Sequence, residues 1–125
     1  MKEDRINRNE SLRIRTKKYA SAVVRLFCCL PRRRTEVDIL GKQMLRSGTS
    51  VAANYREASR ARSNAEFISK IETCLQEADE NMLWLELLRD DCDVTDDSLI
   101  WLLGETNELI SIFVTMVKKV KEREE

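Results

Sequence analysis

Apolar residues recur at intervals of three and four along four separate stretches of the chain, the spacing of one face of an α-helix. One proline and three glycines in 125 residues leave little material for loops. The sequence therefore predicts four helices of roughly 20–27 residues joined by short turns. The expected fold class is all-α, an antiparallel up-down-up-down four-helix bundle. Its expected inner faces include Tyr19, Leu26, Met44, Tyr55, Ile71, Leu85, Leu102, Thr106, Leu109 and Phe113.

Local signals mark the helix boundaries. Pro31 should end the first helix, because a residue that precedes proline avoids helical geometry. Residues 63–66 form a capping box, and Gly48 should mark a bend or the close approach of a neighbouring backbone. The expected helix starts are marked by Ser11, Thr35, Ser63 and Thr95 or Asp96. These signals divide the chain into a flexible tail, the bundle and a C-terminal tail over residues 1–10, 11–121 and 122–125.

The second stretch carries polar residues beside its apolar seam. Four of them follow at steps of four, four and three, and so line one side of the helix: Arg46, Ser50, Asn54 and Glu57. One interpretation is a contact with a ligand or partner. We favour a hydrogen-bonded interface between helices or subunits, in which Arg46 pairs with a carboxylate such as Glu77 or Glu80.

The net charge of zero arises by cancellation. Residues 1–62 contain 16 basic and 6 acidic residues, a net charge of +10, whereas residues 63–125 contain 6 basic and 16 acidic residues, a net charge of −10. In the expected topology the two basic helices lie side by side, opposite the acidic pair. Such a molecule has a large dipole and could self-associate through contacts that salt weakens.

The topology also places charge at the two ends of the bundle. Residues 32–34 should meet the acidic turn at residues 90–97 and be neutralised there. The opposite end should gather the candidate nucleic-acid-binding residues: Arg13, Arg15, Lys17, Lys18, Arg60, Arg62, Lys118 and Lys119. The alternative interpretation is that these are ordinary solvated helix ends.

Sites for chemistry are poorly supported by the sequence. The chain has no histidine, so it lacks Ser-His and Cys-His pairs, and its four cysteines have no C-x-x-C spacing. The acidic turn fails the calcium-loop pattern twice, because Asp96 replaces the required glycine and Leu102 the required glutamate. We therefore expect no enzyme activity, no metal and no cofactor. The cysteines are expected to be reduced thiols in a cytoplasmic protein.

The third stretch is more apolar than one face of a bundle requires. This excess predicts burial against another subunit through Trp84, Leu87 and Leu88. The most apolar run, residues 19–30, is interrupted by Arg25 and is too short to cross a bilayer, so no membrane association is expected.

The motif GKQMLRSGTSVAANYREASRARSNAEF, residues 41–67, resembles the small bacterial four-helix-bundle proteins of the ribosomal-RNA intervening-sequence family. Genes of that family were first noticed within intervening sequences of large-subunit ribosomal RNA genes. The resemblance extends over residues 12–119, although residues 55–58 replace a glycine-containing turn, as in a variant branch. It implies a ring-like homo-oligomer, with a pentamer as a candidate, and a connection with nucleic acid. A related branch accompanies retroelement reverse transcriptases, so a reverse transcriptase is a partner by analogy only.

Two functions follow from these observations. The first is a non-enzymatic, homo-oligomeric binding or accessory protein that associates with RNA, DNA or a ribonucleoprotein through the basic end of the bundle. The alternative is an oligomeric protein–protein interaction scaffold that binds no nucleic acid, in which the charge dipole serves assembly.

Overall fold

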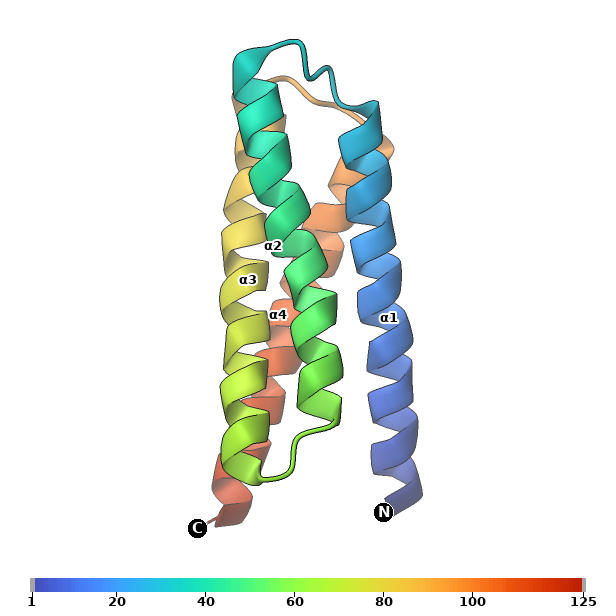
Figure 1. Ribbon diagram of the computed structural model, residues 1–125, viewed down its shortest axis with the longest axis vertical. Helices are drawn as coiled ribbons and strands as arrows, with labels where there is room; N and C mark the ends of the chain where they lie inside the picture. The colour runs from blue at the N-terminus through green and yellow to red at the C-terminus, as the bar shows by residue number, and fades with distance from the viewer. Residues whose placement is uncertain (1, 125) are drawn as a thin grey trace.

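The computed structural model describes the backbone over residues 2–124 and the side chains over residues 10–124. The described backbone forms four helices and no strand: α1 (Lys2–Cys29), α2 (Thr35–Ser59), α3 (Asn64–Asp90) and α4 (Asp97–Glu124). The helices run alternately up and down, and the α2–α3 turn lies at the same end as the two chain termini (Figure 1). The four-helix bundle expected from the apolar periodicity is confirmed.

The first and last helices are longer than expected. α1 begins at Lys2 instead of after Ser11, and α4 continues to Glu124 instead of ending near residue 121. The predicted tails over residues 1–10 and 122–125 are therefore helical wherever the backbone is described, while Met1 and Glu125 lie outside the described residues. The segments contain no glycine or proline and are rich in lysine, arginine and glutamate, which have high helix propensity.

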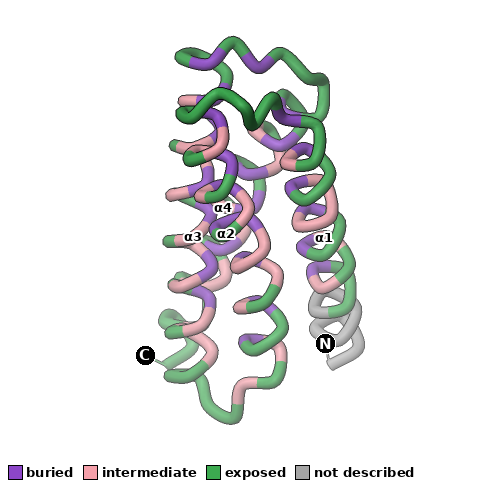
Figure 2. The backbone as a smooth tube through the Cα atoms, turned by 45° about the horizontal axis from the view of Figure 1, so that its top comes forward, coloured by how far each residue is buried: buried purple, intermediate pink, exposed green. Residues whose placement is uncertain are grey.

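The inward faces of the helices form one continuous core (Figure 2). Its largest fully buried side chains include Tyr19, Tyr55, Phe113, Leu26, Met44, Ile71, Leu85, Leu99, Leu102 and Leu109. The rings of Tyr55 and Phe113 stack with their centroids 6.4 Å apart. Most residues expected on the inner faces are buried, and Phe67 and Val117 are half-buried at the periphery.

The helix starts follow local sequence signals to different degrees. The Ser63 hydroxyl accepts a hydrogen bond of 3.1 Å from the Glu66 backbone N–H, as in the expected capping box. The Glu66 carboxylate accepts from the backbone N–H of Arg62 at 3.2 Å, one residue before the expected donor. Thr35 is already helical, and the N-cap position is Arg34, whose side chain makes no capping bond. The prediction of Thr35 as the N-cap was wrong.

Gly48 marks a close approach between α1 and α2. A Cβ atom at this position would lie 2.7 and 2.8 Å from the two methyl groups of Val23. The group that approaches Gly48 is thus a side chain. The sequence had predicted either a bend or the close approach of a neighbouring backbone. Elsewhere α1 packs mainly on α2, and its contact with α4 is the weakest of the four neighbouring helix pairs.

Candidate functional site

Two of the three arginines in Arg32–Arg34 are neutralised, while Arg33 is exposed and forms no ion pair among the described side chains. The turns at residues 30–34 and 91–96 lie at the same end of the bundle, as predicted (Figure 1). Arg34 donates to a Glu36 carboxylate oxygen at 2.8 Å and to the Cys92 carbonyl oxygen at 2.9 Å, and Arg32 lies 3.9 Å from Asp38. The neutralising carboxylates therefore come from the start of α2. The acidic turn contributes a carbonyl oxygen.

The opposite end carries cations with no carboxylate partner. We call this surface the basic end and define it by Arg60, Arg62, Lys118, Lys119 and Arg123. None of the five forms an ion pair with any other described residue, whereas their neighbour Lys121 lies 4.0 Å from Glu72. Glu122 and Glu124 are exposed at the same end and offset the charge only in part.

The α1 cations do not join the basic end as expected. Arg15 makes two hydrogen bonds to the Glu105 carboxylate, at 2.7 and 2.8 Å, and a third of 3.3 Å to Glu108. The bonds to Glu105 and Glu108 raise the pKa of Arg15, so its charge is permanent and already paired. Lys18 lies over the Trp101 ring, 5.7 Å from its centroid.

These contacts place Arg15 and Lys18 beside the first half of α4, far from Lys118 and Lys119. They do not lie at the basic end as expected, because α1 begins ten residues earlier, at Lys2 instead of after Ser11. Arg13 is half-buried and Lys17 is exposed, and neither forms an ion pair among the described side chains.

A cavity of about 760 Å³ opens beside the basic end, between the end of α2, the start of α3 and residues 107–123 of α4, with Leu12 of α1 also in its lining. Its apolar lining comes from Leu12, Ala58, Phe67, Ile112 and Met116. Its cations are Arg62, Lys119 and Arg123, all of which are exposed. One carboxylate, Glu108, also lines the cavity and lies 3.3 Å from Arg15. The cavity thus combines a hydrophobic wall with three cations that form no ion pair among the described residues and one carboxylate that does.

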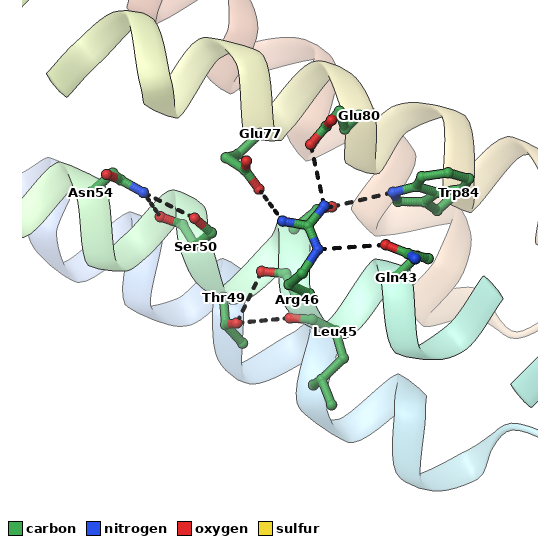
Figure 3. Close-up of polar contacts among 10 residues, drawn as sticks. Gln43, Leu45, Arg46, Thr49, Ser50, Asn54, Glu77, Glu80 and Trp84 are labelled. Atoms are coloured by element: carbon green, nitrogen blue, oxygen red, sulfur yellow. Dashed lines mark hydrogen bonds and ion pairs between the residues drawn. The ribbon is translucent and has the colours of Figure 1, made fainter. Parts of the chain in front are cut away.

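The polar stripe on α2 divides into two parts (Figure 3). Arg46 donates to Glu77 at 3.3 Å and to Glu80 at 3.4 Å, which confirms the expected pairing between α2 and α3. Burial, together with the neighbouring Glu80 carboxylate, raises the pKa of Glu77, although Arg46 acts to lower it. Glu57 completes the same helix contact through Lys70 at 3.1 Å.

Ser50 and Asn54 bond within their own helix. The Asn54 amide donates to the Ser50 carbonyl oxygen and to the Ser50 hydroxyl, both at 2.9 Å. These two residues therefore link no helices in the described contacts. The polar interface between α2 and α3 also includes a bond that the sequence analysis missed, from the Trp84 indole N–H to the Ser47 hydroxyl at 3.2 Å (Figure 3).

The α3 residues expected at a subunit interface pack largely against other parts of the same chain. Leu88 is fully buried in the core, Leu87 is half-buried, and Trp84 is half-buried against Ser47. Leu88 therefore offers no surface to another copy. Exposed large apolar side chains occur instead at Ile14, Val24, Ile39, Leu83, Ile100, Trp101 and Val114.

The remaining candidate chemistry is sparse. Within residues 10–124, no group of three or more His, Cys, Asp or Glu side chains is arranged to hold a metal ion. Asp93 adopts φ 57°, a left-handed conformation that aspartate tolerates in turns. Cys28 and Cys29 are exposed, whereas Cys74 and Cys92 are buried. Burial raises the pKa of Cys74 to about 12, so its thiol is a poor nucleophile at neutral pH.

Among the described residues, α4 is long and apolar enough to cross a bilayer by length and composition alone. The sequence analysis did not identify it as a candidate. Of the most apolar 18-residue segment of α4, 28% is buried inside the bundle. The core residues on α4 include Leu99, Leu102, Leu109 and Phe113.

Sequence reasoning missed the cavity. Phe67 lies in the first turn of α3, at a position of the apolar periodicity, yet it is only half-buried and lines the cavity. Lys119 and Arg123 are four residues apart and share one helix face, which is a signal that could have placed Arg123 with the other cations. The convergence of α2, α3 and α4 on one cavity depends on tertiary structure.

Comparisons with known proteins agree with the fold. A crystal structure of a protein with unknown function from the S23 ribosomal protein family of Bacteroides thetaiotaomicron is similar to this chain, with 33% sequence identity and a TM-score of 0.78. The similarity covers 88% of this chain and 97% of that chain. No curated protein matches. The model of the family described as 23S rRNA-intervening sequence protein matches residues 12–115. The chain therefore belongs to the 23S rRNA-intervening sequence protein family.

Proposed function

We propose that this chain forms a non-enzymatic, homo-oligomeric binding protein of the cytoplasm that associates with RNA, DNA or a ribonucleoprotein through its basic end. The observation that carries the proposal is the set of five cations without carboxylate partners among the described residues: Arg60, Arg62, Lys118, Lys119 and Arg123. Cations that are already neutralised gain little from phosphate, whereas unpaired cations release counterions from a nucleic acid when they bind it.

The contrast between the two ends supports this placement. Arg32 and Arg34 are paired with Asp38 and Glu36, so the most conspicuous arginine run in the sequence is the weaker candidate. The Arg60 and Arg62 side chains are exposed and have no ion pair among the described side chains. They also lie beside a cavity that could hold part of a ligand.

The test is equilibrium binding of labelled RNA and DNA at several salt concentrations. Arg60→Ala/Arg62→Ala should weaken binding and should reduce the dependence of log K on log salt by roughly 0.7 per lost single-strand contact. The matched control is Arg25→Ala/Arg33→Ala, which removes the same charge from exposed positions near the other end. Full binding by the first variant would contradict the placement. Absence of binding at every salt concentration would favour the protein–protein scaffold.

A further inference from the structure

The cavity beside the basic end has two chemically different parts. Leu12 and Ala58 are buried and Phe67, Ile112 and Met116 are half-buried, so the inner wall is apolar. Asn64, Asn107, Ser111 and Thr115 also line the cavity but are exposed, so hydrogen-bonding groups lie toward its mouth. Arg62, Lys119 and Arg123 add three positive charges, whereas the one lining carboxylate, Glu108, is paired with Arg15.

We propose that this cavity holds an unstacked base of a single nucleic-acid strand while Arg62, Lys119 and Arg123 hold the adjacent phosphates; this inference rests on the proposed function. A nucleotide combines the three properties that the lining requires: a flat apolar ring face, polar ring edges and a negative charge. The volume of about 760 Å³ lies within the usual range for small-molecule sites.

The polar residues argue against a purely apolar occupant. An acyl chain could cover Phe67 and Met116, but it would desolvate the Asn64 and Asn107 amides without giving them hydrogen-bond partners. A base offers donors and acceptors along its edge. A duplex is also a poor ligand, because its bases are stacked and paired and would have to be extruded before one could enter.

The test compares two single strands of about ten nucleotides, one with normal bases and one in which every base is absent. The two strands carry the same phosphates, so they separate base recognition from charge. The wild-type protein should bind the base-containing strand at least about fivefold more tightly than the abasic strand, and more tightly than a duplex of the same sequence.

Ser111→Phe should fill the cavity from an exposed position without changing charge. It should remove the preference for the base-containing strand and leave binding of the abasic strand unchanged. Thr115→Phe, at a second exposed lining position, should have the same effect and replaces the first variant if that one unfolds. Ser98→Phe is the matched control, because Ser98 is exposed on α4 and does not line the cavity.

The outcomes separate this inference from the proposed function. Equal affinity of the wild type for both strands, or a preference for the duplex, would overturn the base site. The proposed function would stand if Arg60→Ala/Arg62→Ala still weakened that binding. A preference that survives in both cavity-filling variants would place base recognition elsewhere and so overturn the inference. No binding of any strand would overturn both.

Discussion

Tyr19 connects three helices through one hydroxyl group. It accepts a hydrogen bond of 2.7 Å from the Asn81 amide on α3 and lies 2.6 Å from the Thr106 hydroxyl on α4. Thr106 donates to the Leu102 carbonyl oxygen at 2.6 Å, so Tyr19 is the donor between the two hydroxyls. This bond matters because α1 and α4 otherwise make few contacts. It fixes where α1 lies relative to α4.

Tyr19→Phe should lower the free energy of unfolding by about 1–3 kcal/mol, because the Asn81 amide would be left buried without its partner. The Asn81 carbonyl oxygen already lacks a hydrogen-bond donor among the described atoms, so Tyr19→Phe would leave both polar ends of this buried amide unsatisfied. Adding Asn81→Leu to Tyr19→Phe should recover part of the loss. Urea unfolding measures both variants, and an unchanged midpoint for Tyr19→Phe would contradict this role.

Buried thiol and phenol groups should make the stability of the fold decrease at high pH. Burial raises the pKa of Cys74 and of Tyr55 to about 12 each, and it also raises the pKa of Tyr19. The unfolded chain releases these protons near about 8.5 for Cys and 10 for Tyr, so between those values and about 12 the folded state holds more protons. Their contribution to stability is therefore complete below about pH 8.5 and is lost as the pH rises toward 12.

We expect the thermal unfolding midpoint to fall steeply between pH 9 and pH 11. Cys74→Ala should lower stability at neutral pH but flatten the start of this decline, because it removes the group that titrates first. Calorimetry across that range measures the effect. A midpoint that stays constant to pH 11 would show that these protons are not linked to folding.

At the scale of helices, Gly48 on α2 and Gly104 on α4 have opposite surroundings, and only Gly48 lies where α1 packs on α2. Gly48 faces Val23 too closely for a Cβ atom, whereas nothing lies within 4 Å of the position that a Cβ would take on Gly104. Alanine favours a helix by about 1 kcal/mol over glycine at either position. At Gly48, overpacking against a stiff β-branched side chain should cost about 1–3 kcal/mol and outweigh that gain.

Gly104→Ala should therefore stabilise the protein by about 0.5–1 kcal/mol, and Gly48→Ala should destabilise it. Val23→Ala combined with Gly48→Ala should relieve the clash and lose less than the two separate changes together. Denaturant unfolding of the wild type, the three single variants and the double variant gives the comparison. Equal stabilisation by both glycine replacements would mean that α1 lies farther from α2 than this account requires.

The sequence predicted the helices better than their arrangement. The periodicity of Leu99, Leu102, Leu109 and Phe113 specifies the α4 face directly, and the Ser63 cap is a local signal. The lengths of α1 and α4 could not be fixed: the expected cap, Ser11, lies inside α1, and no glycine or proline interrupts either terminal segment. That error placed Arg15 and Lys18 at the end of the bundle, whereas they lie near the middle of α1, beside Glu105 and Trp101. The cavity was out of reach, because it depends on how the end of α2, the start of α3 and α4 converge in the folded bundle.

At the scale of the whole molecule, exposed apolar side chains favour self-association through α4. Ile100 and Val114 are 54% and 48% exposed and lie on the same face of α4, four helical turns apart. This face replaces the α3 surface expected from Trp84, Leu87 and Leu88. Its burial by a second copy would remove apolar area from water without disturbing the core.

We expect the purified protein to sediment at micromolar concentration as an assembly larger than one chain. Ile100→Glu/Val114→Glu should shift it toward single chains while circular dichroism remains helical, because both positions are exposed. Ser69→Glu/Gln76→Glu, at exposed neutral positions on α3, adds the same two negative charges and is the matched control. A wild-type protein that sediments as one chain would contradict the homo-oligomer proposal.

The most direct test of the central claim is to map binding on the protein by nuclear magnetic resonance. A short single-stranded RNA is titrated into the isotopically labelled protein while the backbone amide shifts are followed. The account expects the largest changes at residues 60–67 and 111–123, around Arg62, Phe67 and Lys119. Changes confined to residues 30–36 and 90–97, at the opposite end of the bundle, would contradict it.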